Sequence, residues 1–260
     1  MLWYLTEVEG WERPAHAWTP ERCLGTAIHA GIAAYWRATT SWGQRIDPIT
    51  ESTRALEECW EETVEGLEIQ TLRVKKTVKA VIRWIEKEMP SAQPMMIEKS
   101  LGFDGHTTPD LVTKEEGNIV ISDWKYSHYL PADRMAYRLE GAARNHQFLH
   151  YVWAVEDYLK QPVYMFRKVV IAGGPQILIK QENWYPQPEE IKAWLAQSCE
   201  KSHQMGLMRT DPTLVYRREE GCKPFGEKWP CEMFDACWTC HGDRKMMEQF
   251  YLRKEGFNHE

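Results

Sequence analysis

The sequence lacks any run of apolar residues long enough to span a membrane, which takes about 18 or more. It also lacks the marks of a secretory signal, because residues 1–7 hold neither a basic stretch nor a long apolar run. A cytoplasmic protein is therefore expected. An excess of basic residues is missing too, since the formal net charge is -6. Such a chain is not expected to coat nucleic acid nonspecifically.

Internal repeats and low-complexity segments are absent as well, and 43% of the 260 residues are hydrophobic. This composition can bury a sizeable core and predicts a single domain over residues 1–260. Positive charge gathers in one stripe, which consists of Arg73, Lys75, Lys76, Lys79 and Arg83. The stripe is either a phosphate-binding surface or a solvated helix face, and taken alone it favours the solvated face.

Helical periodicity dominates the first part of the chain, residues 19–94. The segment Thr19-Pro20-Glu21 is typical of a helix start, with an N-cap followed by proline in the first turn. Two further helices are expected at 51–66 and 69–89, after which Pro90 and Pro94 interrupt the helical pattern.

The second part, residues 95–182, changes to short apolar segments punctuated by glycine. A tight turn at Glu115-Glu116-Gly117-Asn118 predicts that the flanking segments form a hairpin. The expected strands are 95–101, 106–113 and 118–124, then 163–171 and 176–179, with a helix at 139–159 between the two groups.

The third part, residues 183–260, contains a predicted helix at 187–205, a cysteine-rich tail and a final helical stretch at 243–254. Taken in order, these elements predict an α/β protein. Its central mixed sheet is flanked by helices, with a helical N-terminal part and a cysteine-bearing C-terminal tail.

Acidic and basic side chains meet at the ends of the second and third predicted strands. Asp123 and Lys125 are two residues apart, so they project from one face of a strand, and Trp124 projects from the other. The turn at Gly117 makes the two strands antiparallel neighbours, which brings Asp110 beside Asp123. The alternative is an ordinary surface pair of Asp123 and Lys125, with Asp110 as a turn residue.

This set of side chains suits the hydrolysis of a phosphodiester bond. Mg²⁺ and Mn²⁺ prefer carboxylate oxygens, so Asp110 and Asp123 can hold one ion between them. Two close carboxylates repel each other without a cation. A lysine beside them can orient or deprotonate the attacking water, or stabilise developing charge.

Two further motifs accompany this set. Gly25-Thr26-Ala27-Ile28-His29 places a histidine on the first helix, and Gln147-Phe148-Leu149-His150-Tyr151 lies on the helix after the third strand. With Pro109-Asp110 and Asp123-Trp124-Lys125, they resemble the PD-(D/E)XK nuclease superfamily, and within it the RecB-like branch of the phage exonuclease and CRISPR-adaptation nuclease type. The match covers roughly residues 19–180 and implies a restriction-endonuclease-like core.

The resemblance implies roles for the central residues. Asp110, Asp123 and the main-chain carbonyl of Trp124 would ligate the catalytic Mg²⁺ or Mn²⁺. His29 would be an additional metal ligand, in preference to a histidine that is merely satisfied on a helix flank. Lys125 would act on the attacking water.

The resemblance also implies roles for outer residues. Gln147 and Tyr151, one helical turn apart, would support the site or contact the DNA backbone, although simple helix amphipathicity explains them almost as well. Glu98 is a candidate outer carboxylate. Asp104 and His106 compete with Asp110 for the metal, and the preceding proline and the spacing favour Asp110.

The implied activity is metal-dependent cleavage of DNA, by an exonuclease acting on ends or single strands in recombination, repair or phage DNA processing. The alternatives are a structure-selective or site-specific endonuclease, and a non-catalytic nucleic-acid-binding module with a relic site. A recombination or replication protein is the expected protein partner.

Four cysteines crowd the C-terminal tail: Cys222, Cys231, Cys237 and Cys240. Such a set can hold a four-iron cluster or zinc. Only Cys237 and Cys240 have the paired spacing of a zinc ribbon, and Pro230-Cys231 resembles the iron–sulfur tail of RecB-like nucleases. A four-iron cluster is therefore favoured over zinc, with metal-free reduced cysteines as the third alternative.

In RecB-like nucleases with such a cluster, one cysteine comes from a Cys-Pro element before an N-terminal aromatic stretch. Leu2-Trp3-Tyr4-Leu5 resembles that stretch, but no cysteine precedes it. Either Cys222 or Cys240 completes the set, or Cys23 does, or the natural N-terminus lies further upstream. The cluster would clamp the tail onto the N-terminal helices.

Overall fold

The computed structural model describes residues 11–12, 20–40, 45–60, 64–101, 107–128, 146–174, 176–210 and 252–253. The chain divides into two compact units, one of residues 18–194 and one that joins residues 1–17 to 195–260. That residues 1–260 form a single domain stays a prediction. Among the described residues, no helix is both long and apolar enough to cross a membrane.

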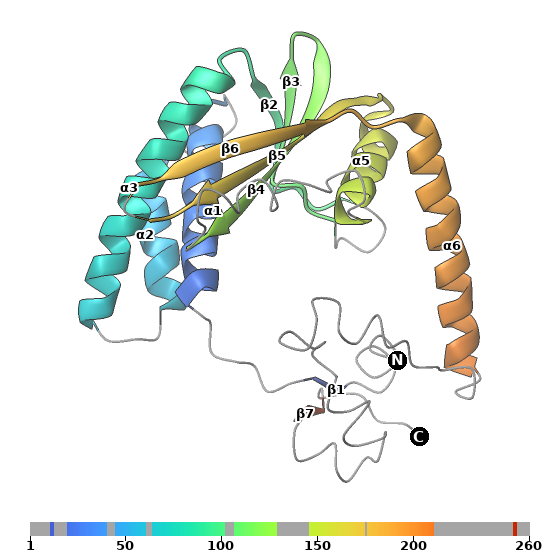
Figure 1. Cartoon of the computed structure of the whole chain (residues 1–260), viewed down its shortest axis with the longest axis horizontal. Helices are drawn as coiled ribbons and strands as arrows, with labels where there is room; N and C mark the ends of the chain where they lie inside the picture. Colours follow the sequence, from blue (N-terminus) through green and yellow to red (C-terminus); the bar gives the residue numbers. More distant parts are fainter. Residues whose placement is uncertain are drawn as a thin grey trace. The chain divides into compact units, whose positions relative to one another are not determined.

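A five-stranded mixed sheet lies at the centre of the unit formed by residues 18–194 (Figure 1). The strands are β2 (Gln93–Ile97), β3 (Leu111–Glu115), β4 (Asn118–Ser127), β5 (Val163–Ala172) and β6 (Leu178–Trp184). They lie side by side in chain order. Only β4 and β5 are parallel, because a helix-bearing connection separates them, whereas the other neighbours are antiparallel.

Helices cover both faces of the sheet (Figure 1). On one side are α1 (Pro20–Ala38), α2 (Pro48–Cys59) and α3 (Val64–Glu88), and on the other is α5 (His146–Leu159). A further helix, α6 (Pro188–Thr210), follows β6 along the chain. The core on the α1–α3 side includes Trp124, Val169 and Ile171 of the sheet. Phe166 points to the opposite face, where its ring stacks on Phe148 of α5 at 4.3 Å. The predicted α/β fold is confirmed.

The predicted turn between the second and third strands forms as expected. Glu116 and Gly117 have φ angles of 49° and 90°, and positive values at both central positions are typical of a two-residue hairpin turn. The turn sets the register of the hairpin, with Glu115 opposite Asn118 and Leu111 opposite Ser122.

Several predicted boundaries were wrong. The second helix begins at Pro48, because Asp47 accepts the N–H of Thr50 as an N-cap, and it ends at Cys59. The third helix begins at Val64 instead of residue 69, and β2 ends at Ile97. Within the predicted helix at 243–254, residues 252–253 form β7 (Leu252–Arg253), which pairs with β1 (Trp11–Glu12). The remainder of that stretch lies outside the described residues.

A buried ion pair joins β3 to β5. Arg167 is 4% exposed, and its two terminal nitrogens donate to the two carboxylate oxygens of Glu115 at 2.9 and 2.7 Å. A bidentate pair of this kind fixes both side chains. Removing one partner leaves a buried charge without compensation, which costs far more than losing a surface pair.

We therefore expect Glu115→Ala to lower the free energy of unfolding by about 3–5 kcal/mol. Urea denaturation followed by circular dichroism measures the change. Asp157→Ala is the matched control, since Asp157 pairs with Lys160 on the exposed surface, and its cost is about 1 kcal/mol or less. Equal losses in the two variants would show that burial of Arg167 does not matter.

Candidate active site

Strand β4 carries two side chains of opposite charge on one face. Lys125 Nζ donates to Asp123 Oδ1 at 2.9 Å. The Asp123 side chain is fully buried, whereas Lys125 is 42% exposed, so the lysine connects a buried carboxylate with solvent. A surface ion pair, the alternative interpretation of the sequence, is therefore wrong for Asp123.

Trp124 anchors the strand from the other face. Its ring is 1% exposed and meets Trp84 of α3 edge-to-face, with 5.9 Å between ring centroids. The predicted alternation along β4 is thus confirmed. Because Trp124 is fixed in the core, the neighbouring Asp123 and Lys125 are held in direction on the opposite face.

Asp110 reaches the same place from a bend and not from within a strand. Strand β3 begins one residue later, at Leu111, so the prediction that Asp110 lies in a strand was wrong. Asp110 Oδ2 accepts the main-chain N–H of Trp124 at 2.7 Å. This bond holds the carboxylate of Asp110 beside β4, just before the start of β3.

His29 of α1 faces the carboxylates. Its Nδ1 lies 3.6 Å from Asp110 Oδ1. Burial alone would lower the pKa of His29, but the attraction and hydrogen bonding of Asp110 outweigh it and raise the pKa. A positive charge on the imidazole and a negative charge on Asp110 therefore stabilise each other.

The two carboxyl groups differ in their proton affinity. Desolvation, followed by repulsion from Asp110, raises the pKa of Asp123 from 3.8 to about 6, against the opposing attraction of Lys125. Desolvation would also raise the pKa of Asp110, but His29 and the N–H of Trp124 lower it overall. Of the two carboxyl groups, Asp110 therefore loses its proton more readily, and burial makes the negative charge of Asp123 the more costly one.

Helix α5 presents a hydrogen-bonded pair near this set. Gln147 Nε2 donates to the Tyr151 hydroxyl at 2.7 Å, as expected from their spacing of one turn. Burial, followed by the negative charges of Asp123 and Asp110, raises the pKa of Tyr151 to about 12. The phenol therefore stays protonated at neutral pH and can donate a hydrogen bond.

Comparison with known proteins identifies the family. Residues 1–224 match a model of the PD-(D/E)XK nuclease superfamily. This chain belongs to the PD-(D/E)XK nuclease superfamily. No curated protein matches it. A solved structure described as "Crystal structure of SSO0001" is similar to this chain with a TM-score of 0.25 and 8% sequence identity. The match covers 67% of this chain and 73% of the chain in that structure.

Proteins of this superfamily are generally metal-dependent nucleases that use ions such as Mg²⁺ or Mn²⁺. The donors present fit such an ion, because Asp123 Oδ2 is buried with no hydrogen-bond partner and is a hard oxygen. The N–H and C=O of a strand residue point to the same side, so the Trp124 carbonyl faces the side of Asp110.

Three metal-binding side chains do not converge on one point here. Among the residues that the structure describes, no group of three or more His, Cys, Asp or Glu side chains is arranged to hold a metal ion. Each carboxylate has its own partner, Lys125 for Asp123 and Trp124 N–H for Asp110.

Glu98 borders the site in an unusual conformation. Its φ angle is 45°, a left-handed value that costs a non-glycine residue energy, and its N–H donates to the Asp110 carbonyl at 3.0 Å. Its carboxylate accepts from Arg37 of α1 at 2.7 Å. The sequence singled out Glu98 but not Arg37, since a pairing across 61 residues leaves no local signal. Asp104 and His106 lie outside the described residues.

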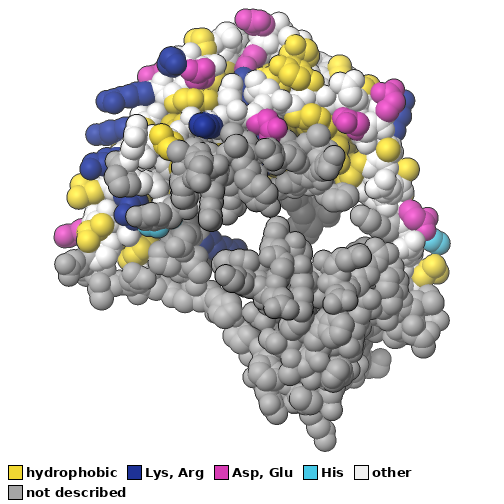
Figure 2. Space-filling model, viewed as in Figure 1, with side chains coloured by type: hydrophobic (Ala, Val, Ile, Leu, Met, Phe, Trp, Pro, Cys, Tyr) yellow, Lys and Arg dark blue, Asp and Glu magenta, His cyan; other side chains and the backbone are white. Residues whose placement is uncertain are grey.

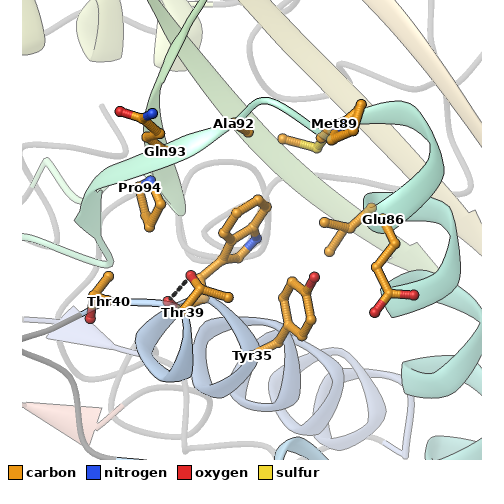
Figure 3. Close-up of a pocket in the computed structure, with 11 residues that line it drawn as sticks. Tyr35, Thr39, Thr40, Glu86, Met89, Ala92, Gln93 and Pro94 are labelled. Carbon is orange, nitrogen blue, oxygen red and sulfur yellow. Dashed lines mark hydrogen bonds between the residues drawn. The ribbon is translucent and has the colours of Figure 1, made fainter.

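Two cavities lie along α1. A cavity of about 420 Å³ is lined by Gly25, His29, Arg37 and Glu98 among others, so it reaches the candidate site at His29. A larger one, of about 530 Å³, lies between the ends of α1 and α3 and the start of β2 (Figure 3). Tyr35, Glu86, Met89 and Gln93 line it, and Asp110, Asp123 and Lys125 do not. Because His29 lines only the smaller cavity, the larger one is not the candidate reaction site of this nuclease-family chain.

The four tail cysteines, Cys222, Cys231, Cys237 and Cys240, lie outside the described residues. Cys23 is described. It is 1% exposed within the core of α1, α2 and α3, and its thiol donates to the Cys59 carbonyl at 2.8 Å. A thiol that is buried and already bonded in this way is a poor fourth ligand for a cluster in the tail. The iron–sulfur cluster stays a prediction.

Proposed function

We propose that this chain is a Mg²⁺- or Mn²⁺-dependent DNA nuclease of the RecB-like type, acting on DNA ends or single strands. The observation that carries the proposal is the buried Oδ2 of Asp123, which has no hydrogen-bond partner and belongs to a carboxyl group that Asp110 repels and Lys125 attracts. A divalent cation would stabilise a buried carboxylate oxygen of this kind, and at this place it would lie beside an ammonium group that reaches solvent.

In the proposed mechanism, Asp110, Asp123, the Trp124 carbonyl and His29 hold the divalent ion. When bound, that ion supplies polarisation of the scissile phosphate and charge stabilisation for the leaving oxygen. His29 must be neutral to serve as a ligand. The positive charge of a nearby divalent ion would favour loss of the imidazole proton.

Lys125 is the group placed to act on the attacking water. Its ammonium group is partly exposed and held by Asp123, so it can orient a water molecule or stabilise the charge that develops on the phosphate. Tyr151 keeps its proton and can donate a hydrogen bond to a phosphate oxygen, while Gln147 fixes the direction of the hydroxyl.

The decisive experiment compares end-labelled linear DNA with closed circular single-stranded DNA, each with and without Mn²⁺. An exonuclease degrades the linear strand to short products and leaves the circle intact. Cutting of the circle would support the alternative, a structure-selective or site-specific endonuclease. If neither DNA is cut at any Mn²⁺ concentration, the proposed catalysis is wrong, and DNA binding without cleavage would then indicate a nucleic-acid-binding module with a relic site. The expected recombination or replication partner stays a prediction.

A further inference from the structure

Of the five basic residues that the sequence places in a stripe, Lys76, Lys79 and Arg83 are exposed on α3, whereas Arg73 and Lys75 are half-buried, and the stripe here means the exposed arc of α3. With 100° between successive helix positions, Lys76, Lys79 and Arg83 fall within one narrow arc of the helix surface. All three are exposed. Ile69 and Leu72 extend the same arc toward the start of the helix and are 54% and 62% exposed. The opposite side of α3 packs into the core through residues such as Val74, Val78 and Val81.

The three basic residues of this stripe have no partners. Within the part of the chain that the structure describes, Lys76, Lys79 and Arg83 form no ion pair or hydrogen bond. Other exposed cations do pair with acidic neighbours, as Arg54 does with Glu58. In a chain with more acidic than basic residues, three unpartnered cations on successive turns of one helix are unlike an ordinary solvated face.

The spacing of the cations in the stripe is comparable to, though wider than, the spacing of phosphates along a nucleic-acid strand. Lys76 and Arg83 are seven residues apart, so three cations occupy about 10 Å of helix, or one per roughly 5 Å. One strand of duplex DNA carries a phosphate about every 3.4 Å of axis. Dark blue side chains gather along the edge of the molecule over α3 (Figure 2), although the net charge of the whole chain is -6.

A hydrogen bond connects this helix with the strand of the candidate active site. Arg73, one turn before Lys76, has its Nη1 3.0 Å from the Nε2 of His128. His128 directly follows β4, three residues after Lys125. The bond therefore joins α3 to the residue that follows the strand of Asp123 and Lys125, and Arg73 lies about 60° around the helix from Lys76.

We propose that Lys76, Lys79 and Arg83 bind the sugar–phosphate backbone of the DNA whose phosphodiester bond is cleaved at β4. The inference rests on the proposed function, since it assigns the path of the same substrate. Bound at the stripe, the backbone is held without contact to base edges, so the binding is independent of sequence. The two exposed apolar residues of the stripe are too few to hold a helix in a membrane surface, which favours DNA over an anionic lipid.

The test measures the binding of a fluorescein-labelled 30-base-pair duplex in EDTA, where no cleavage occurs. Fluorescence anisotropy at several salt concentrations gives the slope of log affinity against log salt. The triple variant Lys76→Gln, Lys79→Gln, Arg83→Gln should reduce this slope by about 2–3, because each lost phosphate contact contributes about 0.9. Its affinity at low salt should fall roughly 10-fold or more.

The matched control removes three exposed, unpartnered lysines elsewhere: Lys114→Gln, Lys180→Gln, Lys192→Gln. It changes the net charge equally and should keep the slope within about one unit of the parent. A second variant, Lys76→Arg with Lys79→Arg, keeps the charge and should keep the slope. Thermal melts of all variants should agree, because exposed substitutions change stability by about 0.5 kcal/mol or less.

The outcomes separate this inference from the proposed function. If the parent cleaves DNA but the stripe variant and the control lose affinity equally, the stripe is a solvated face and the inference is wrong. If the parent cuts nothing and still binds DNA through the stripe, the proposed function fails and DNA binding by α3 stands. Binding to phosphatidylglycerol vesicles without binding to the duplex would also overturn the inference.

Discussion

Lys125→Met is expected to lower the rate of Mn²⁺-dependent DNA cleavage by about 10²–10⁴-fold, the range that a positioned proton-transfer group contributes. Methionine has a similar length and volume but no charge, so it keeps the packing and removes the ammonium group. The ammonium group lies 2.9 Å from Asp123 and is the only described basic group bonded to that carboxylate. The effect should appear in kcat, because the group acts on charge that develops during the reaction.

Initial rates measured across DNA concentrations at saturating Mn²⁺ give kcat and KM separately. Lys114→Met is the control, since Lys114 lies on β3 of the same sheet but is exposed and outside the site. A thermal shift on adding Mn²⁺ shows whether the Lys125 variant still binds the metal. Should the Lys125 and Lys114 variants cleave equally fast while both bind Mn²⁺, the lysine has no part in the chemistry.

The sequence predicts the part of this site that depends on local geometry. The alternation of Asp123, Trp124 and Lys125 follows from the two-residue period of a strand, and the turn at Gly117 follows from its conformational preference. Both are properties of a few consecutive residues. For the same reason, the fold class was predictable from the order of helical and extended segments.

The sequence does not predict the contacts that depend on tertiary packing. Asp110 accepts the N–H of Trp124 from the bend just before β3, which begins at Leu111. No sequence pattern shows that the strand begins at Leu111 and not before Asp110. The approach of His29 depends on how α1 docks on the sheet. The pair of Arg167 and Glu115 joins strands 52 residues apart, and a buried arginine looks like any surface arginine in the sequence.

Asp123 connects the stability of the fold with metal binding. Its pKa in the folded chain is raised from 3.8 to about 6, so the folded state favours the protonated form. The stability that this group contributes is therefore complete below about pH 4 and is lost as the pH rises through 6. A shift of about two units corresponds to about 3 kcal/mol, which the metal-free protein loses by pH 8.

Asp123→Asn should consequently stabilise the metal-free protein at pH 8. The amide is neutral and nearly the same size, so the desolvation and the repulsion from Asp110 disappear, while the charge-assisted bond from Lys125 is weakened. The expected gain is about 1–3 kcal/mol, or roughly 2–12 °C in Tm for a chain of this size. The gain should be about half as large at pH 5, where the parent is already largely protonated at this position.

Mn²⁺ should reverse this order of stability. A cation at Asp123 offsets the buried charge. Mn²⁺ at 100 times its dissociation constant stabilises the parent by about 2.7 kcal/mol. The asparagine variant gains little, because its neutral amide replaces the charged carboxylate ligand. Thermal melts at pH 5 and pH 8, with EDTA or Mn²⁺, measure all four combinations. Asp157→Asn, an exposed carboxylate paired with Lys160, should follow the parent in each. If Mn²⁺ stabilises the Asp123 variant and the parent equally, the buried carboxylate is not a metal ligand. A metal bound at Asp123 would offset its buried negative charge and would therefore stabilise the parent more than the variant.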